Sequence, residues 1–319
     1  TNATLSLSNV NSSDAGQYSV VVTATCGAIT SSNAQLTVTP LTSISSQPVA
    51  VTVCEGNMVN LSVTASGTGN LTYQWYQNGT ALNSISATTD QYSNNGTLND
   101  AGSYTVLVTG TCSSISSNLV NVVINQNTSI TSQPTAYVGC AFIPSSISVS
   151  AIGTNLSYQW NLAGTPIVGA TNSTYSISSP VSANTGNYSV DILGTCGNVT
   201  SNSASITINS LPTVDAIAGG NNGVCLGASI NLTDQTPNGV WTINNTSIAT
   251  ISSTGVVTGV SIGSATVTYT VTNGNGCVNS VTKVIQVKSL PAVAIQTPIA
   301  TTICQGEPLS LMSNPAISY

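Results

Sequence analysis

A pattern with a period of roughly 86 residues runs through the first two thirds of the chain. Three motifs carry it: ISSQP at 44–48 and ITSQP at 130–134; LTYQW at 71–75 and LSYQW at 156–160; DAGQY at 14–18, DAGSY at 100–104 and NTGNY at 184–188. A self-similar unit of this length is one complete small domain. The chain is therefore predicted to be an array of domains rather than one large fold.

Within each unit the apolar residues occupy every second position, as in the run 59–65, where Asn, Ser and Thr lie between them. Such alternation, in segments rich in Val, Ile, Thr and Tyr, is typical of half-buried strands. Asn78-Gly79 is a hairpin turn signal. No stretch shows a helical period, and about seven short strands in one unit predict a β-sandwich.

Composition excludes several classes of function. Only 3% of the residues are charged, and the chain contains no histidine and two basic residues, Lys283 and Lys288. Without histidine there is no Ser-His-Asp or Cys-His couple, and two lysines cannot supply a nucleic-acid footprint. We expect no catalysis within residues 1–319, no cofactor and no nucleic-acid partner. No run approaches the ~20 apolar residues of a spanning helix, so we expect no membrane insertion in this segment.

The order of motifs in 41–126 resembles the intermediate-type immunoglobulin-like domain. The motifs in that order are Gln47-Pro48, Glu55-Gly56, the run 59–63, Tyr73-x-Trp75 and the DAGSY motif at 100–104. The resemblance covers 41–126 and 127–210 in full. Residues 1–40 match only the C-terminal half of such a domain, strands E to G.

This resemblance implies roles for individual residues. Trp75 and Trp160 are implied to be the core tryptophans. The implied tyrosine corners are Tyr18, Tyr104 and Tyr188. The family's disulfide would fall at Val63 and Val106, so an apolar pair replaces it.

Residues 211–290 resemble a different family, the bacterial Ig-like domain of group 2. Four blocks carry this resemblance: VWT at 240–242, SIATI at 247–251, GVVTGV at 255–260 and GSATV at 263–267. Trp241 is the implied core tryptophan. Residues 291–319 begin a further Ig-like domain, since CQGE at 304–307 is similar to the CEG at 54–56. The predicted fold is all-β, a tandem array of Ig-like β-sandwich domains, and both ends look like cuts in a longer array.

The eight cysteines fall into two classes by their place in the unit. Cys54, Cys140, Cys225 and Cys304 precede the second strand, whereas Cys26, Cys112, Cys196 and Cys277 lie at the turn after the predicted tyrosine-corner strand. No CxxC pair and no histidine is present, so we expect no metal site. Cysteines of this kind predict disulfides in an oxidising, extracellular place.

Two pairing schemes compete. Sequence locality favours Cys54–Cys112, Cys140–Cys196 and Cys225–Cys277. In the immunoglobulin topology, however, the two classes lie at opposite ends of a domain, roughly 25 Å apart, and a disulfide tolerates a Cα separation of about 7 Å. We hypothesise staples between neighbouring domains, Cys54–Cys196 and Cys140–Cys277, with Cys26, Cys112, Cys225 and Cys304 paired outside this segment. Intradomain pairs with a rearranged topology, and intermolecular pairs, stay open.

Few side chains are candidates for binding. Asp14 and Asp100 belong to the tyrosine-corner motif and are interpreted as structural, and Asp215 is the one candidate for an inter-domain calcium ligand. Tyr73 and Tyr158 could lie on an exposed sheet face as a sugar-stacking platform. Cross-strand packing is the preferred interpretation of both tyrosines.

The predicted function is structural: a stalk, fibre or filament shaft within a large secreted bacterial surface protein. Little charge means little self-repulsion and weak salt sensitivity along a packed fibre. The expected partners are other copies of the chain or neighbouring repeats. The alternatives are Ig-like modules that bind a glycan or a cell-surface protein, and spacer domains of a larger extracellular enzyme.

Overall fold

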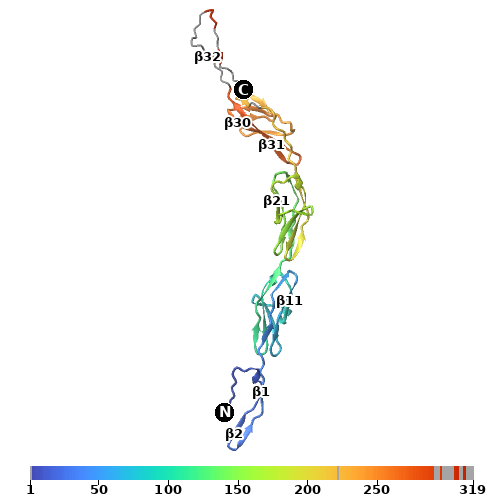
Figure 1. The fold of residues 1–319 in the computed structure, drawn as a ribbon, viewed down its shortest axis with the longest axis vertical. Coiled ribbons are helices and arrows are strands. Elements are labelled where there is room, and N and C mark those ends of the chain that lie inside the picture. Colours follow the sequence, from blue (N-terminus) through green and yellow to red (C-terminus); the bar gives the residue numbers. More distant parts are fainter. Residues whose placement is uncertain (1, 221–222, 291–294, 297–304, 309–311, 314–319) are drawn as a thin grey trace. The chain divides into compact units, whose positions relative to one another are not determined.

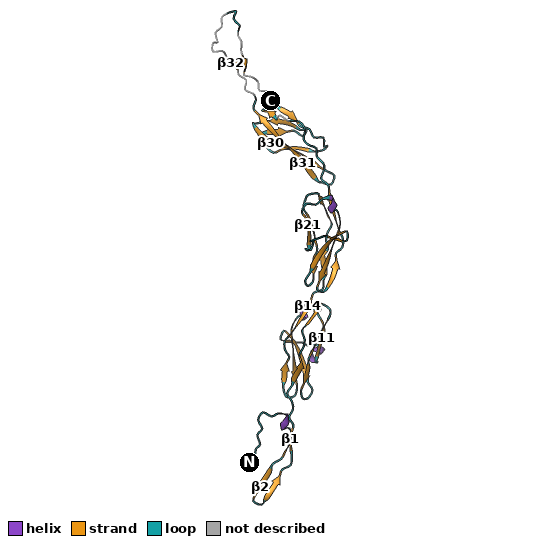
Figure 2. Ribbon diagram, viewed as in Figure 1, coloured by secondary structure: helices purple, strands orange, loops and turns teal. Residues whose placement is uncertain are grey.

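The computed structural model describes residues 2–220, 223–290, 295–296, 305–308 and 312–313. These residues form short strands joined by turns and by four single-turn 3-10 helices, and none of them forms an α-helix (Figure 2). No helix within the described ranges is long and apolar enough to cross a membrane. The chain is therefore all-β, as predicted.

The first full repeat (41–126) contains two short pairs and one larger sheet. The pairs are β5 (Ser43–Ser46) with β8 (Thr64–Ser66) and β7 (Met58–Ser62) with β11 (Gln91–Asn95). The larger sheet has the order β10 (Thr80–Ala81), β9 (Thr72–Gln77), β12 (Gly102–Thr109), β14 (Val120–Asn125) and β6 (Val51–Cys54), with β13 (Ser114–Ser116) also on β12. Only the β14–β6 contact within this sheet is parallel.

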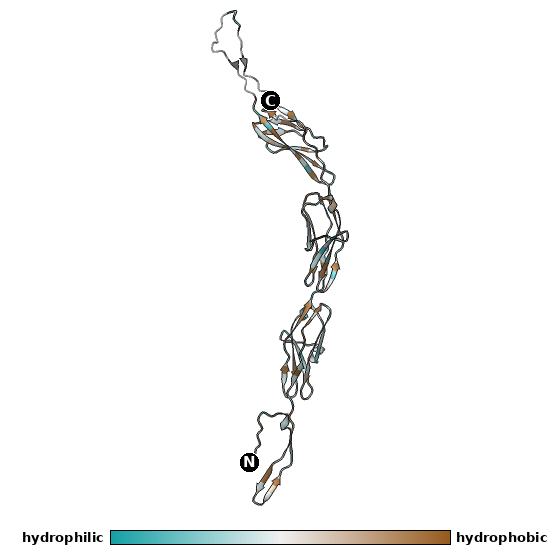
Figure 3. Cartoon of the chain, viewed as in Figure 1, coloured by the Kyte–Doolittle hydropathy of each residue, from teal (hydrophilic) through white to brown (hydrophobic). Residues whose placement is uncertain are grey.

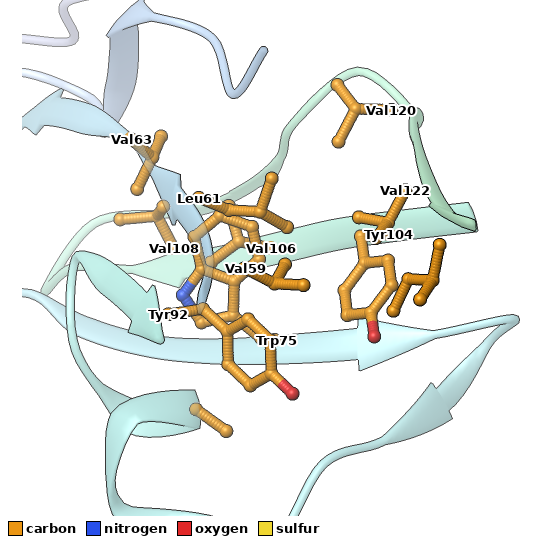
Figure 4. Close-up of a cluster of buried hydrophobic side chains, with 12 residues drawn as sticks. Val59, Leu61, Val63, Trp75, Tyr92, Tyr104, Val106, Val108, Val120 and Val122 are labelled. Atoms are coloured by element: carbon orange, nitrogen blue, oxygen red, sulfur yellow. The ribbon is translucent and has the colours of Figure 1, made fainter. Parts of the chain in front are cut away.

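The core of this repeat follows from the period of two. The residues of β7 alternate between exposed and buried, and those of β12 alternate between half-buried and buried. The buried side chains are Val59, Leu61, Val63, Trp75, Ala87, Tyr92, Tyr104, Val106, Val108, Val120, Val122 and Ile124 (Figure 4). Val63 and Val106 both belong to this cluster, so an apolar pair lies where the family would have its disulfide.

The second full repeat (127–210) has the same sheet order. Its pairs are β15 (Ser129–Ser132) with β18 (Ser150–Ile152) and β17 (Ser145–Ser148) with β21 (Thr174–Ile177). Its larger sheet has the order β16 (Tyr137–Cys140), β24 (Ala204–Asn209), β22 (Gly186–Gly194), β19 (Ser157–Leu162) and β20 (Thr165–Pro166), with β23 (Gly197–Thr200) also on β22. The repeat in sequence is thus a repeat in topology.

Residues 2–40 contain fewer elements. The pairs are β1 (Gly16–Tyr18) with β4 (Ala34–Leu36) and β2 (Val21–Ala24) with β3 (Gly27–Thr30), after the 3-10 helix Ser12–Asp14. The exposed fractions of Val20 and Val22 are 54% and 58%, whereas the equivalent Val106 and Val108 are fully buried. These two pairs therefore bury little of their apolar side.

The domain at 211–290 has a different sandwich. One sheet has the order β25 (Val224–Cys225), β31 (Val278–Lys288), β30 (Gly263–Thr272) and β27 (Val240–Ile243). The other has the order β26 (Ser229–Asn231), β29 (Val256–Gly259) and β28 (Ala249–Ile251). β31 pairs antiparallel with β30 over ten residue pairs and parallel with β25. Beyond this domain, β32 (Ile295–Gln296) pairs with β33 (Met312–Ser313).

Side-chain hydrogen bonds explain why particular motifs recur. Gln47 accepts a hydrogen bond from the Asn118 backbone (2.8 Å), and Gln133 accepts the same bond from Asn202 (2.8 Å). In each repeat this glutamine therefore connects the end of the first strand to the segment just before the last strand. In Figure 3 the apolar colour lies mainly on strands. The hydrogen bonds of Gln47 and Gln133 involve the segments that connect the strands.

The tryptophan motif has a second glutamine with the same kind of role. Gln74 Nε2 donates to the carbonyl oxygens of Trp75 (2.9 Å) and Leu82 (2.8 Å). Gln159 Nε2 makes the matching bonds in the second repeat, at 2.8 Å each. Asn78 and Gly79 both have positive φ and form the two-residue hairpin turn between β9 and β10.

Candidate functional site

The candidate site is the pair of cysteine-linked junctions. Cys54 forms a disulfide with Cys196, and Cys140 forms one with Cys277, each with a Cα–Cα distance of 5.6 Å. The linked residues are 142 and 137 positions apart in sequence. Each disulfide therefore links one repeat to the next rather than closing a single sandwich.

Both disulfides lie inside compact parts of the structure. By its internal contacts the chain divides into one unit of Thr1–Pro134, Ser148–Tyr175 and Ser189–Ser203, and another of Thr135–Ile147, Ser176–Tyr188 and Ala204–Tyr319. Cys54 and Cys196 belong to the first unit, and the other two linked cysteines to the second. The second full repeat, which contains the β21 that Figure 1 labels, is divided between the two units. Its part with Cys196 is grouped with the first repeat, and its part with Cys140 is grouped with the domain at 211–290.

Backbone pairing positions both cysteines of the first junction. Cys54 is the last residue of β6, and the following turn closes with the Asn57 N–H donating to the Cys54 carbonyl (3.0 Å). Cys196 lies in the tight turn that joins β22 to β23, where Gly194 faces Gly197. Strand ends thus present the two thiols at fixed backbone positions.

Hydrogen bonds hold the connection between the two repeats beside this disulfide. Asn127 Nδ2 donates to the Glu55 carbonyl (3.0 Å), and the Thr128 N–H donates to the Cys196 carbonyl (3.1 Å). Asn127 and Thr128 are neighbours, so consecutive residues bind the two turns that carry the cysteines. The disulfide is one part of a larger junction.

Asparagines serve the second junction in a similar way. Asn273 Oδ1 accepts a hydrogen bond from the Cys277 backbone (3.0 Å), and its Nδ2 donates to the Ser210 carbonyl (2.9 Å). Asn279 Nδ2 donates to the Pro212 carbonyl (2.9 Å). Cys277 is fully buried. Sequence reasoning missed these asparagines, because a chain this rich in Asn gives them no distinguishing signal.

The remaining cysteines are in a different state. Cys26, Cys112 and Cys225 are exposed and form no disulfide, and Cys304 lies outside the described residues. Cys112 occupies the same place in its repeat as Cys196, and its Sγ lies 2.6 Å from Thr39 Oγ1. Cys225 ends a strand parallel to β31, as Cys54 ends one parallel to β14. Cys225 thus has the backbone setting of Cys54, whereas Cys112 lies in a four-residue loop between β12 and β13 rather than in a two-residue turn like that of Cys196.

An unusual residue follows Cys140. Gly56 and Gly227, two positions after their cysteines, have φ of 87° and 78°, but the equivalent residue in the second repeat is Phe142, with φ of 66°. A bulky residue rarely adopts this conformation. Phe142 is the single phenylalanine of the sequence and is 61% exposed. Comparing the Cys-x-Gly motifs would have found it.

Phe142 lies beside a shallow groove. The groove is lined by Ala141, Phe142, Val181, Ser182, Ser210, Leu211, Pro212, Thr213 and Asn279. None of these side chains is ionisable. The groove adjoins the second disulfide, since Ala141 follows Cys140 and the Ala141 N–H donates to the Asn209 carbonyl (2.8 Å).

The six aromatic residues singled out from the sequence differ in burial. Trp75, Trp160, Tyr104 and Tyr188 are fully buried, whereas Trp241 and Tyr18 are half-buried. Each of the three tyrosine hydroxyls donates to the carbonyl four residues earlier: Tyr18 to Asp14 (2.7 Å), Tyr104 to Asp100 (2.8 Å) and Tyr188 to Asn184 (2.8 Å). Burial raises the pKa of the Tyr104 and Tyr92 phenols.

Of the two interpretations of Tyr73, the structure supports packing and not an exposed sheet face. Tyr73 packs against the buried cluster that contains Trp75. The reason is the period of a strand, since residues two positions apart point to the same face. Tyr158 stands in the same relation to Trp160 and is half-buried. These tyrosines are therefore packing residues rather than a sugar platform.

The carboxylates are placed as follows. Asp14 and Asp100 accept hydrogen bonds from the backbone N–H groups of Asn11 and Thr97, both 2.8 Å long, which fixes the turns before the corner tyrosines. Asp215 is exposed. The described residues contain no group of three or more His, Cys, Asp and Glu side chains that could hold a metal ion.

Comparison with known families agrees with the two kinds of sandwich. Residues 42–122 match the immunoglobulin I-set domain, and residues 212–281 match the bacterial Ig-like domain of group 2. Each match covers one domain of the chain. No curated protein sequence matches this chain.

Solved structures similar to this chain contain several Ig domains. An I-band fragment of titin, I67–I69, is 13% identical, with a TM-score of 0.44, and the match covers 80% of this chain and all of the fragment. Immunoglobulin domains 1–5 of Sidekick-1 are 18% identical, with a TM-score of 0.46, and the match covers 88% of this chain and 67% of that chain.

Proposed function

We propose that this array of tandem immunoglobulin-like domains is a structural segment, such as a stalk or filament shaft, of a large secreted bacterial surface protein. The observation that carries the proposal is the linkage of successive repeats by Cys54–Cys196 and Cys140–Cys277. Domains joined by a single strand of chain normally move relative to one another. A second covalent link restrains that hinge, which is the property a shaft requires.

The composition supports an extracellular structural role. Disulfides persist in oxidising compartments outside the cytosol. The formal net charge of −6 is spread over 319 residues, so long-range repulsion along the array is weak. Two lysines also leave little for trypsin-like proteases to cleave. The match of residues 212–281 to a bacterial Ig-like family supports a bacterial source.

Immunogold electron microscopy of the source cells tests the proposal. Antibodies raised against residues 41–210 are expected to label projections or filaments on the outside of intact cells. Permeabilised cells provide the control for total protein. Label that appears only after permeabilisation would contradict the proposed location.

A second candidate function is recognition of a glycan, favoured by the exposed Phe142 ring and the neutral groove beside it. An aromatic face with nearby hydroxyl and amide groups suits an uncharged sugar. A glycan array with the wild-type chain and the Phe142→Gly variant checks this role, with Val168→Gly, at a fully exposed residue, as the control. Binding that is equal in all three proteins, or absent, counts against it.

A further inference from the structure

We infer that the two disulfides form overlapping covalent loops that limit how far the array can extend under tension. This inference rests on the proposed structural role and deepens it. The first loop runs from Cys54 to Cys196 and the second from Cys140 to Cys277. The two loops share residues 140–196, which make up most of the second full repeat. The array is thus interlocked rather than linked end to end.

The first disulfide shortens the covalent path through two domains. Tension that arrives at Cys54 crosses to Cys196 and then needs only about 30 residues of backbone to reach Cys225. Without the bond, the same force passes through about 170 residues. The short path contains β23 and β24, which are already extended strands and have little length to release.

The second disulfide shortens the covalent path from the first full repeat to the domain at 211–290 in the same way. From Cys112, about 30 residues of backbone lead to Cys140, and the bond then reaches Cys277 directly. This path contains β14, β15 and β16. The two paths include β14, which lies between β12 and β6, and β24, which lies between β16 and β22.

No covalent route from Cys54 to Cys277 avoids all three cores. The route across Cys54–Cys196 continues through residues 197–276, with Trp241, and the route across Cys140–Cys277 first passes through residues 55–139, with Trp75. The shortest route uses both disulfides and the shared residues 140–196, with Trp160. Once all three domains have unfolded, the distance between Cys54 and Cys277 is therefore limited to the length of this shared segment, about 56 residues.

The free cysteines extend the same scheme. Cys112 lies between β12 and β13 as Cys196 lies between β22 and β23, and Cys225 ends a parallel-paired strand as Cys54 does. Where the pairing rule continues along a longer chain, each repeat is bonded to both neighbours. Each disulfide-closed loop then overlaps the next one along the whole array.

Single-molecule pulling on the 319-residue chain through terminal tags tests the inference, with Cys26, Cys112, Cys225 and Cys304 replaced by serine. The oxidised chain should extend, once every domain has unfolded, to the length of about 150 residues. With dithiothreitol the full 319 residues should extend, a gain of roughly 550–600 Å.

Variants that remove one disulfide at a time test whether the two loops overlap. In the same background, Cys54→Ser and Cys140→Ser should each extend to about 175–180 residues, so the two disulfides remove far less together than the sum of their separate effects. In this background the local pair that can still form is Cys140–Cys196, so an oxidised length of about 260 residues would overturn the inference. Equal oxidised and reduced lengths would also overturn it. Neither outcome depends on where the cell places the protein.

Discussion

The first full repeat and the domain at 211–290 solve the same packing problem with different cores. In the repeat, Trp75 is fully buried and its Nε1 donates to the Thr89 carbonyl (2.9 Å). In the other domain, Trp241 is half-buried and packs on Tyr269, with ring centroids 4.5 Å apart. The strand order also differs, since the sheet that contains Trp241 has four strands rather than six.

Their ends, in contrast, are alike. Each has a cysteine as the last residue of a strand that pairs parallel with its neighbour, Cys54 in β6 and Cys225 in β25. A glycine with positive φ follows two residues later in both. Each also has a cysteine at the turn after the longest buried strand, Cys112 and Cys277. The two domains therefore differ in their cores but share the placement of the cysteines at their ends. The feature common to the array is the site at which one domain is linked to the next.

Removing a disulfide should have the largest effect. Closing a loop of about 140 residues contributes roughly 5 kcal/mol in the chain-entropy account, so Cys54→Ser and Cys140→Ser should destabilise their junctions by similar amounts. Urea unfolding followed by tryptophan fluorescence measures this. Cys112→Ser is the control, since Cys112 forms no disulfide in this chain. A loss of stability in Cys54→Ser no larger than that in Cys112→Ser would contradict a stabilising role for the Cys54–Cys196 disulfide.

The two core tryptophans should separate the domains. Trp75→Ala should cost about 3–5 kcal/mol, because it empties a fully buried site and leaves the Thr89 carbonyl without its donor. Trp241→Ala should cost less, since Trp241 is only half-buried. Denaturant midpoints of the transition assigned to each domain provide the measurement. Equal costs would mean that the two cores are more alike than their burial indicates.

Removing one tyrosine hydroxyl in each of the two domains compares the hydrogen bonds that these hydroxyls make. Tyr104→Phe should cost about 1 kcal/mol, because the Asp100 carbonyl loses its partner while the ring stays packed. Tyr269→Phe should cost more, since the Tyr269 hydroxyl both accepts from the Gly239 N–H (2.9 Å) and donates to the Thr236 carbonyl (2.6 Å). Thermal unfolding by calorimetry measures both. The reverse order would contradict this account of the two sites.

The turn after the cysteine should give the smallest effects. Gly56→Ala and Gly227→Ala should each cost about 1 kcal/mol, because their φ is positive and no neighbouring atom lies within 4 Å of an added Cβ. Phe142→Gly should have the opposite sign, since it relieves the same conformation. Chemical denaturation of the three variants checks this. A destabilising Phe142→Gly would show that the ring contributes packing at its junction.

Local rules predicted most of the fold. The period of two identified the strands that contain Val59 and Tyr104, and the Asn78-Gly79 turn formed where its residue types require it. The same period places Tyr73 on the face of Trp75, two positions along the strand, where it packs against the buried cluster. The repeat also located Gln47, but its bond to the Asn118 backbone became visible only in three dimensions.

The junctions were harder to predict from sequence. The cysteine positions could be sorted by class, but the hydrogen bonds of Asn127, Asn273 and Asn279 could not, because they depend on how two repeats meet. Phe142 departs from a local rule that Gly56 and Gly227 obey. Such departures reflect tertiary context, which a single sequence does not contain.

Peptide mapping without reduction tests the central claim most directly. Pepsin digestion of the oxidised chain at low pH suits it, since only Lys283 and Lys288 are trypsin sites and acid suppresses thiol exchange. The account predicts linked peptides that contain Cys54 with Cys196 and Cys140 with Cys277. Linked peptides that contain Cys54 with Cys112, or Cys140 with Cys196, would contradict it.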